Sequence, residues 1–136
     1  RGFCSDLTRV IWLGPPSPLH RLVYHLVAQA YAAAVACLHA GVSSRTVDAT
    51  ARKVITAAGY GQYFIHGTGH SLGRRIHQLP KISPHAPSHV LRAGTAVTIE
   101  PGIYLPHRFG IRLEDTFLVT PTGHRRLTHT PLTVIP

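Results

Sequence analysis

The chain has 136 residues, the size of one domain with a single hydrophobic core. Its 44% of hydrophobic residues is ordinary for a globular protein, and no apolar run has the length of a membrane span or the pattern of a signal peptide. The two cysteines, Cys4 and Cys37, match neither a disulfide framework nor a zinc ribbon, so we expect a reduced, cytoplasmic protein.

The chain is strongly basic, with a formal net charge of +9 from 14 Lys and Arg against 5 Asp and Glu. Such a balance attracts phosphate groups without specifying a sequence. The basic residues are scattered, however, and form only the short pairs Arg74–Arg75 and Arg125–Arg126. We therefore expect a solvated arginine-rich surface rather than a specific nucleic-acid or membrane site.

The first part of the chain predicts a strand and a long helix. Residues 2–13 are rich in β-branched and aromatic side chains, which favours a strand. Ser17 followed by Pro18 is typical of a helix start, with Ser as the N-cap and Pro at the first helical position. The Ala- and Leu-rich sequence predicts that this helix extends to Ala40 and ends at Gly41.

A second helix and a strand-rich half follow. The helix is predicted over 44–58, where apolar residues recur at the i, i+4, i+7 and i+8 spacing. Beyond it we expect a strand entering the glycine-rich segment near 63–70, and a loop over 79–94. Strands over 95–100 and 111–120, joined by a long turn, and a last strand in the tail should follow. Two helices followed by antiparallel strands predict an α+β fold.

Three of the five acidic residues lie in apolar, strand-like surroundings: Asp6, Glu100 and Glu114. A carboxylate in such a place is costly unless it is paired with a cation or bound to a metal. The residues alone leave both readings open, since Glu114 could pair with Arg112 and Asp6 with Arg9. If the two C-terminal strands are neighbours, Glu100 and Glu114 project from one face of a sheet.

The other two acidic residues have simpler expectations. Asp48 lies on the second predicted helix and is expected to be solvated. Asp115 follows Glu114 directly, so on a strand it faces the opposite way, and we expect a structural role.

The stretch FIHGTGHSLG at 64–73 places His66 and His70 among three glycines, and His77 follows seven residues after His70. Histidines alone are weak indicators of a ligand, but glycines let the backbone approach a ligand or another strand closely. An imidazole together with several carboxylates suits Mn²⁺, Co²⁺ or Zn²⁺ in a hydrolytic site.

Five segments in order carry a family resemblance: SDLTR (5–9), HGTGHSLG (66–73), IHQLP (76–80), TIEPGIY (98–104) and IRLEDT (111–116). Together they resemble the catalytic domain of the metallopeptidases with the pita-bread fold, which include methionine aminopeptidase, aminopeptidase P, prolidase and creatinase. The sequences of these motifs most closely resemble those of the Xaa-Pro enzymes, aminopeptidase P and prolidase. The resemblance implies metal-dependent hydrolysis of the peptide bond that precedes proline.

The resemblance also implies the organisation of the chain. It covers nearly all the residues and matches the second half of the fold, two helices packed on a curved antiparallel sheet. The family has a further ligand aspartate eleven residues before the aspartate of SDLTR, a position that would precede Arg1. We therefore expect residues 1–136 to be the C-terminal part of a catalytic domain, truncated at its N-terminus.

Carried over position by position, the family pattern implies a role for seven residues. The metal ligands would be Asp6, His70, Glu100 and Glu114. Asp6 and Glu114 match the carboxylates that bridge two metals. Glu100 would also transfer the proton while a metal-bound hydroxide attacks the carbonyl. The substrate would be held, and the tetrahedral intermediate stabilised, by His66 and His77. A bridging carboxylate would be oriented by Arg112.

The implied cofactor is a divalent metal, Mn, Co or Zn, with two ions in the complete site and one expected in this chain, which alone should be weak or inactive. The implied partners are a proline-containing peptide and a second copy in a homodimer. The alternative is a non-catalytic relative of the same fold that binds peptides or proteins. Because the four ligand positions are all present, the sequence favours the enzyme.

Overall fold

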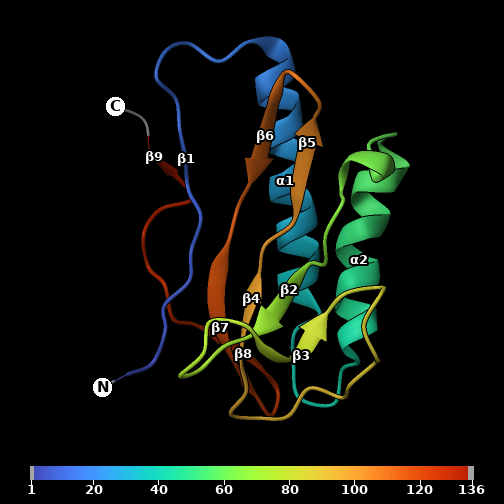
Figure 1. Cartoon of the computed structure of the whole chain (residues 1–136), viewed down its shortest axis with the longest axis vertical. Coiled ribbons are helices and arrows are strands. Elements are labelled where there is room, and N and C mark those ends of the chain that lie inside the picture. The colour runs from blue at the N-terminus through green and yellow to red at the C-terminus, as the bar shows by residue number, and fades with distance from the viewer. Residues whose placement is uncertain (1, 135–136) are drawn as a thin grey trace.

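The computed structural model describes residues 2–134. Two helices, α1 (Pro18–Ala36) and α2 (Ser44–Ala57), lie side by side against one face of a five-stranded sheet (Figure 1). The sheet has the order β3-β2-β4-β7-β8, and every pairing in it is antiparallel. The predicted α+β arrangement, with two helices packed on an antiparallel sheet, is confirmed.

Helix α1 begins where the sequence predicts but ends earlier. The hydroxyl of Ser17 accepts a hydrogen bond from the backbone N–H of His20, which caps the first turn. The helix ends at Ala36 rather than Ala40. The backbone N–H groups of Ala40 and Gly41 donate instead to the carbonyls of Thr120 and Leu91, so contacts with distant segments replace the last helical turn.

Helix α2 matches its predicted range to within one residue and ends before Gly59, which has a φ of 84°. Its predicted apolar face is buried, because Val47, Ala51 and Ile55 are each 0% exposed. These residues join one hydrophobic core with side chains from α1 and from the sheet, among them Val23, Val27, Ala30, Val97, Ile99, Phe117 and Val119.

The strands of the main sheet are short: β2 (Gly69–Ser71), β3 (Gln78–Ile82), β4 (Ala96–Ile99), β7 (Asp115–Thr120) and β8 (Gly123–Arg126). Strand β2 begins only at Gly69, later than the strand predicted to enter the glycine-rich segment near 63–70. Part of the predicted loop over 79–94 forms β3, which pairs with β2 around a bulge at His70 and Ser71. The residues after the turn at 121–122 return along β7 as β8.

A two-stranded hairpin replaces the predicted long turn over 101–110. Strand β5 (Gly102–Leu105) pairs with β6 (Phe109–Arg112), and His107 in the turn has a φ of 57°. The predicted strand over 111–120 is therefore divided, because its first residues pair in this hairpin and its last residues pair in the main sheet. Glu114 lies at the change-over, just before β7.

The N-terminal segment forms less strand than predicted. Of residues 2–13, only β1 (Val10–Ile11) is a strand, paired in parallel with β9 (Thr133–Val134). The predicted last strand is thus present as β9, and residues beyond 134 lie outside the described part. Thr8 adds a single antiparallel bridge to Glu114. Most of the segment therefore lies beside the sheet without extending it, as Figure 1 shows.

A buried ionic network fastens the N-terminal segment to the sheet. Asp115 is 0% exposed and accepts hydrogen bonds from Arg9, Arg126, Tyr31 and Thr128. Burial alone would raise the pKa of Asp115, but the hydrogen bonds from these four side chains bring it below its usual value. The predicted structural role of Asp115 is confirmed.

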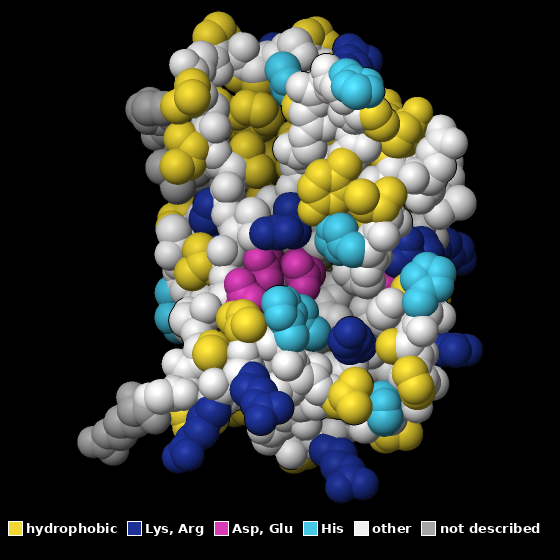
Figure 2. All heavy atoms as spheres, in the orientation of Figure 1, with side chains coloured by type: hydrophobic (Ala, Val, Ile, Leu, Met, Phe, Trp, Pro, Cys, Tyr) yellow, Lys and Arg dark blue, Asp and Glu magenta, His cyan; other side chains and the backbone are white. Residues whose placement is uncertain are grey.

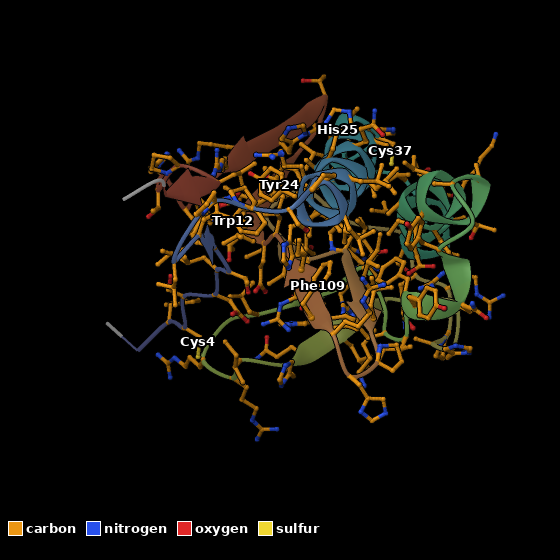
Figure 3. The ribbon with its side chains drawn as sticks, turned by 90° about the horizontal axis from the view of Figure 1, so that it is seen from above. Cys4, Trp12, Tyr24, His25, Cys37 and Phe109 are labelled. Carbon is orange, nitrogen blue, oxygen red and sulfur yellow. The ribbon has the colours of Figure 1, made fainter. Side chains whose placement is uncertain are left out.

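Aromatic packing holds the same segment at its other end. Trp12 lies 6.0 Å from Tyr24 of α1, measured between ring centroids, and His20 lies 4.3 Å from Phe109 of the hairpin. Figure 3 shows Trp12, Tyr24 and Phe109 gathered around the start of α1, with Cys4 and Cys37 far apart. Both cysteines are free thiols. Within residues 2–134, no helix is both long and apolar enough to cross a membrane.

We predict that Gly69→Ala destabilises the sheet strongly. A β carbon at Gly69 would lie 2.0 Å from the backbone carbonyl oxygen of Thr98, so β2 would have to move away from β4. The free energy of unfolding, measured by urea denaturation, should fall by about 3 kcal/mol. The matched control is Gly123→Ala, whose β carbon would meet only Thr120 Oγ1 at 4.0 Å. An equal loss in both variants would contradict this explanation.

Candidate metal centre

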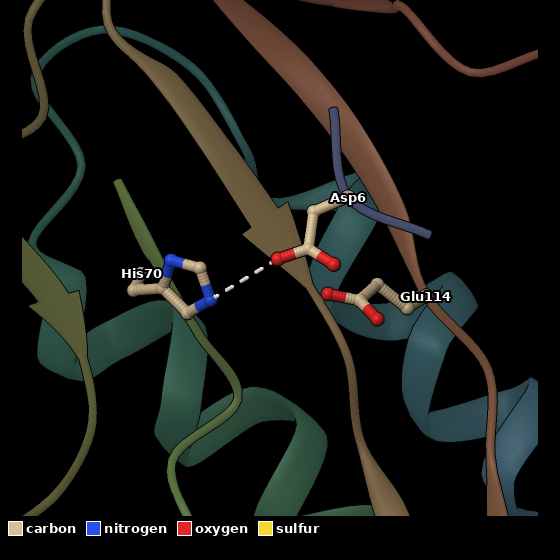
Figure 4. A group of neighbouring side chains, drawn as sticks. All are labelled: Asp6, His70 and Glu114. Atoms are coloured by element: carbon tan, nitrogen blue, oxygen red, sulfur yellow. Dashed lines mark ion pairs between the residues drawn. The ribbon is translucent and has the colours of Figure 1, made fainter. Parts of the chain in front are cut away.

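Three side chains from separate segments converge at one place. Asp6 comes from the N-terminal segment, His70 from β2 and Glu114 from the residue before β7 (Figure 4). One ligand atom from each lies within 4.8 Å of the others. Glu100, immediately after β4, joins them, with its Oε1 3.3 Å from His70 Nε2. Together these four residues are the acidic centre.

The acidic centre opens to solvent on one side. Its side chains range from 2% exposed for Glu114 to 25% for Asp6. In Figure 2 the acidic side chains form one central cluster that is bordered by histidine and by basic residues. A cavity of about 630 Å³ adjoins it, lined by His66, His77 and Lys81 among others. A small ion or the end of a peptide can therefore reach the carboxylates.

Strand pairing brings the two glutamates together. In the β4–β7 ladder Ile99 pairs with Asp115, so the residues just beyond this pair, Glu100 and Glu114, are neighbours. The predicted adjacency of the two strands is thus confirmed. Thr98 ties the ladder to β2, because its hydroxyl accepts a hydrogen bond from the backbone N–H of His70 and lies 3.2 Å from Glu100 Oε1.

The imidazole of His70 is oriented for a ligand. Its Nδ1 lies 3.1 Å from the carbonyl oxygen of Ser71, which can only accept, so Nδ1 carries the proton. In the neutral ring the lone pair of Nε2 then faces Asp6 Oδ2 at 3.7 Å and Glu100 Oε1 at 3.3 Å. A histidine that binds a metal commonly donates its other ring N–H to a carbonyl in this way.

Without a cation, the carboxylates of the acidic centre disfavour one another's charge. Burial, with the nearby charges of Glu100 and Asp6, raises the pKa of Glu114 to about 7. Burial alone would lower the pKa of His70, but Glu100, the Ser71 carbonyl and Asp6 raise it above its usual value. Burial would raise the pKa of Glu100, whereas His70 brings it below its usual value. The centre thus retains protons that a divalent cation could displace.

Arg112 reaches Glu114 through a hydroxyl. Thr8 Oγ1 donates to Glu114 Oε2 at 2.5 Å and accepts from Arg112 Nε at 3.0 Å. Arg112 Nε itself is 3.8 Å from Glu114 Oε2. The guanidinium therefore lies beside the carboxylate without neutralising it completely, and Thr8 fixes the direction in which the carboxylate points.

His66 and His77 border the centre without joining the acidic cluster. His66 Nδ1 is 2.7 Å from the carbonyl oxygen of Gly67 and therefore carries the proton, while Nε2 accepts from the hydroxyl of Tyr104 at 2.8 Å. The ring of His77 contacts the ring of His70 edge-on, with 4.4 Å between centroids. Both imidazoles line the adjoining cavity.

The structure thus brings together all seven residues that the sequence analysis singled out. It also corrects one of the alternatives and one of the expectations. Arg9 pairs with Asp115 and not with Asp6. Asp48 is not solvated, because its side chain is 2% exposed and pairs with Arg52. Three neighbours were missed, Thr8, Thr98 and Tyr104; all lie inside the motif segments, but only the fold shows what their hydroxyls contact.

The donor set fits a hard or borderline divalent cation. It consists of one imidazole nitrogen and three carboxylates, with no thiolate, which favours Mn²⁺, Co²⁺ or Zn²⁺ in an oxygen-rich site. The orientation of the His70 ring and the crowding of partly buried carboxylates agree with this fit.

Comparison with known proteins agrees with the geometry. The family model of metallopeptidase family M24 matches residues 1–121. The chain belongs to this family. It is 44% identical over 126 residues to the Xaa-Pro dipeptidase of Pyrococcus furiosus, covering 93% of this chain and 36% of that relative.

Two solved structures confirm the fold. A structure of Xaa-Pro dipeptidase from Bacillus anthracis superposes with a TM-score of 0.95 at 42% identity, covering 99% of this chain and 38% of that one. The X-Pro aminopeptidase from Thermotoga maritima gives a TM-score of 0.95 at 35% identity, with the same coverage. The M24 chain is thus the second half of a pita-bread fold, and it spans less than two fifths of these relatives, in their C-terminal part.

We predict that the metal-free M24 chain loses stability as the pH rises from about 5 to about 7.5. The pKa of Glu114 is raised from 4.5 to about 7, so its contribution is complete below pH 4.5 and is lost as the pH rises through 7. The raised pKa of His70 acts in the same direction, whereas the lowered pKa of Glu100 acts only at lower pH. The loss should be about 2 kcal/mol.

The measurement is the free energy of unfolding by urea in the presence of a chelator. Glu114→Gln should flatten the pH dependence, because the amide does not titrate. Excess Mn²⁺ should reverse the slope, because the ligands bind in their deprotonated forms. An unchanged slope in Glu114→Gln would show that another group causes it.

Proposed function

We propose that this M24 chain supplies the metal-binding part of a peptidase that cleaves the peptide bond preceding proline. The observation that carries the proposal is the convergence of His70 and three carboxylates, with the His70 ring held so that its free nitrogen faces two of them. The Xaa-Pro names of the similar proteins support the choice of substrate.

The chain would hold one divalent ion through its four ligands: Asp6, His70, Glu100 and Glu114. When bound, the ion would supply a Lewis acid and lower the pKa of a coordinated water to about 7. We propose Mn²⁺ as the ion, with Co²⁺ and Zn²⁺ as the other candidates. The proposal extends to a cytoplasmic enzyme that forms a homodimer, and to residues 1–136 as the C-terminal part of its catalytic domain.

The protein's own groups would handle the proton and the substrate. Glu100 is 14% exposed and its pKa lies below its usual value, so it is ionised at neutral pH and could accept a proton. His66, held between the Gly67 carbonyl and the Tyr104 hydroxyl, lies beside the cavity where a peptide would enter. His77 on the other side can orient the carbonyl and stabilise its developing charge.

Arg112 would act on the ligands and not on the substrate. Through Thr8 it fixes the rotamer of Glu114, and its positive charge lowers the cost of placing that carboxylate beside Glu100 and Asp6. A fixed rotamer keeps the ligand oxygens at the spacing that one ion requires.

The first prediction of this proposal concerns metal content. The M24 chain loaded with Mn²⁺ and desalted should retain about one ion per chain by elemental analysis. Glu100→Gln and His70→Gln should each lose most of it, since each removes one of four ligands. The matched control is His25→Gln, because His25 is exposed and lies on α1, which supplies no residue to the acidic centre. Absence of metal from the wild-type chain would refute a site assembled by these residues alone.

The second prediction concerns activity. The Mn²⁺-loaded chain should hydrolyse alanylproline slowly and alanylalanine far more slowly, and Glu100→Gln should abolish both reactions. Amino-acid release is measured by chromatography after long incubation. Equal rates for the two peptides would contradict the proposed substrate class. Metal uptake combined with peptide binding but no hydrolysis would fit both the expected inactivity of this half alone and the alternative, a non-catalytic peptide-binding relative.

A further inference from the structure

Asp48 and Arg52 lie one turn apart on α2, where they face the segment that carries His66. Their side chains form a two-pronged ion pair, with Arg52 Nε 2.9 Å from Asp48 Oδ2 and Nη2 3.0 Å from Oδ1. Asp48 is 2% exposed and Arg52 is 25% exposed. Burying the carboxylate of such a pair costs free energy, so the remaining contacts of both side chains indicate what the pair does.

The guanidinium of Arg52 binds two backbone carbonyls two residues apart. Nη1 donates to the carbonyl of Phe64 at 2.9 Å, and Nη2 donates to that of His66 at 2.8 Å. The same guanidinium lies over the ring of Phe64, 4.2 Å from its centroid. Arg52 thereby fixes the backbone at Phe64 and at His66, on the two sides of Ile65.

The carboxylate of Asp48 fixes Thr68, two residues further along the chain. Its Oδ1 accepts from the backbone N–H of Thr68 at 3.0 Å and from the Thr68 hydroxyl at 2.9 Å. The carbonyl of Thr68 in turn accepts from the backbone N–H of Glu100 at 2.7 Å. One helix turn is thus linked through Thr68 to the backbone of one of the proposed metal ligands.

These contacts lie directly beside the acidic centre but touch none of its reacting atoms. Arg52 holds the backbone carbonyl of His66, and His70 is the second residue after Thr68. Gly67 and Gly69 make this segment intrinsically permissive, so external hydrogen bonds must define its path. A planar guanidinium suits the task, because its donors reach two carbonyls and a carboxylate at the same time.

We propose that Asp48 and Arg52 are positioning residues of the metal centre: they clamp the backbone of residues 64–68 from α2 and so set the orientations of His66 and His70. The expected effect on metal affinity rests on the proposed function, because it presupposes that the acidic centre binds a metal. Its direct effect, the placement of the two imidazoles, is independent of any metal.

The test compares Arg52→Lys with Arg45→Lys in the M24 chain. Arg45 is an exposed residue on the same helix, so its replacement is the matched control. Arg52→Lys keeps the charge but cannot reach both carbonyls and the carboxylate. We expect the affinity for Mn²⁺, measured by calorimetry, to fall about tenfold, as when groups that orient ligands are removed. In the metal-free chain, the imidazole ¹⁵N resonances of His66 and His70 should shift; Arg45→Lys should change neither property.

Thr68 provides a second, milder test that leaves the ion pair intact. Thr68→Val removes the hydroxyl that donates to Asp48, and Thr68→Ser retains it. We expect the imidazole resonances to shift in the Val variant and to stay near their wild-type positions in the Ser variant. This comparison decides the matter even if Arg52→Lys fails to fold.

The outcomes separate the two proposals. Lower thermal stability in Arg52→Lys and Thr68→Val, with unchanged Mn²⁺ affinity and unchanged imidazole resonances, would overturn the positioning role and leave only a structural one. If the wild-type chain binds no Mn²⁺, the proposed function fails. The resonances would then still decide whether α2 positions the histidines.

Discussion

Electrostatic repulsion among partly buried carboxylates is the constraint on which the rest of this structure depends. Asp6, Glu100 and Glu114 meet around one imidazole, and burial together with the neighbouring charges raises the pKa of Glu114 to about 7. Such an arrangement forms only if contacts with the surrounding fold hold each carboxylate in place. The β4–β7 ladder, the Thr98 hydroxyl and the Thr8 bridge each fix one part of the centre, and a divalent cation would convert the remaining repulsion into ligand bonds.

The adjacent residues Glu114 and Asp115 show how this fold separates a functional carboxylate from a structural one. Asp115 points into the protein, where two arginines, a tyrosine and a threonine donate to it and lower its pKa. Glu114 points the other way and receives one short hydrogen bond from Thr8, while Arg112 stays 3.8 Å away. A carboxylate with complete hydrogen bonding stabilises the native state by itself, whereas an incompletely compensated one gains most from binding a cation.

The helices contribute more than a hydrophobic cover for the sheet. α1 supplies Tyr31 to the Asp115 network, and α2 supplies the Asp48–Arg52 pair that holds the glycine-containing segment. On the other side of this segment, β2 approaches β4 so closely at Gly69 that no side chain would fit. The glycine-rich segment thus acquires a defined path from contacts with α2 on one side and with β4 on the other.

The sequence by itself determined the starts of both helices, the apolar face of α2 and the residue types of the acidic centre, because capping, helical periodicity and motif spacing are local properties. It did not determine that residues 102–112 form a hairpin, that residues 78–82 form a strand, or that α1 stops at Ala36, since partners distant in the chain decide each of these. Nor did it distinguish a solvated Asp48 from a buried one, or an Asp6–Arg9 pair from the observed Arg9–Asp115 pair. Only the tertiary structure decides which charges meet, because the energy of a carboxylate depends on the groups that surround it in space.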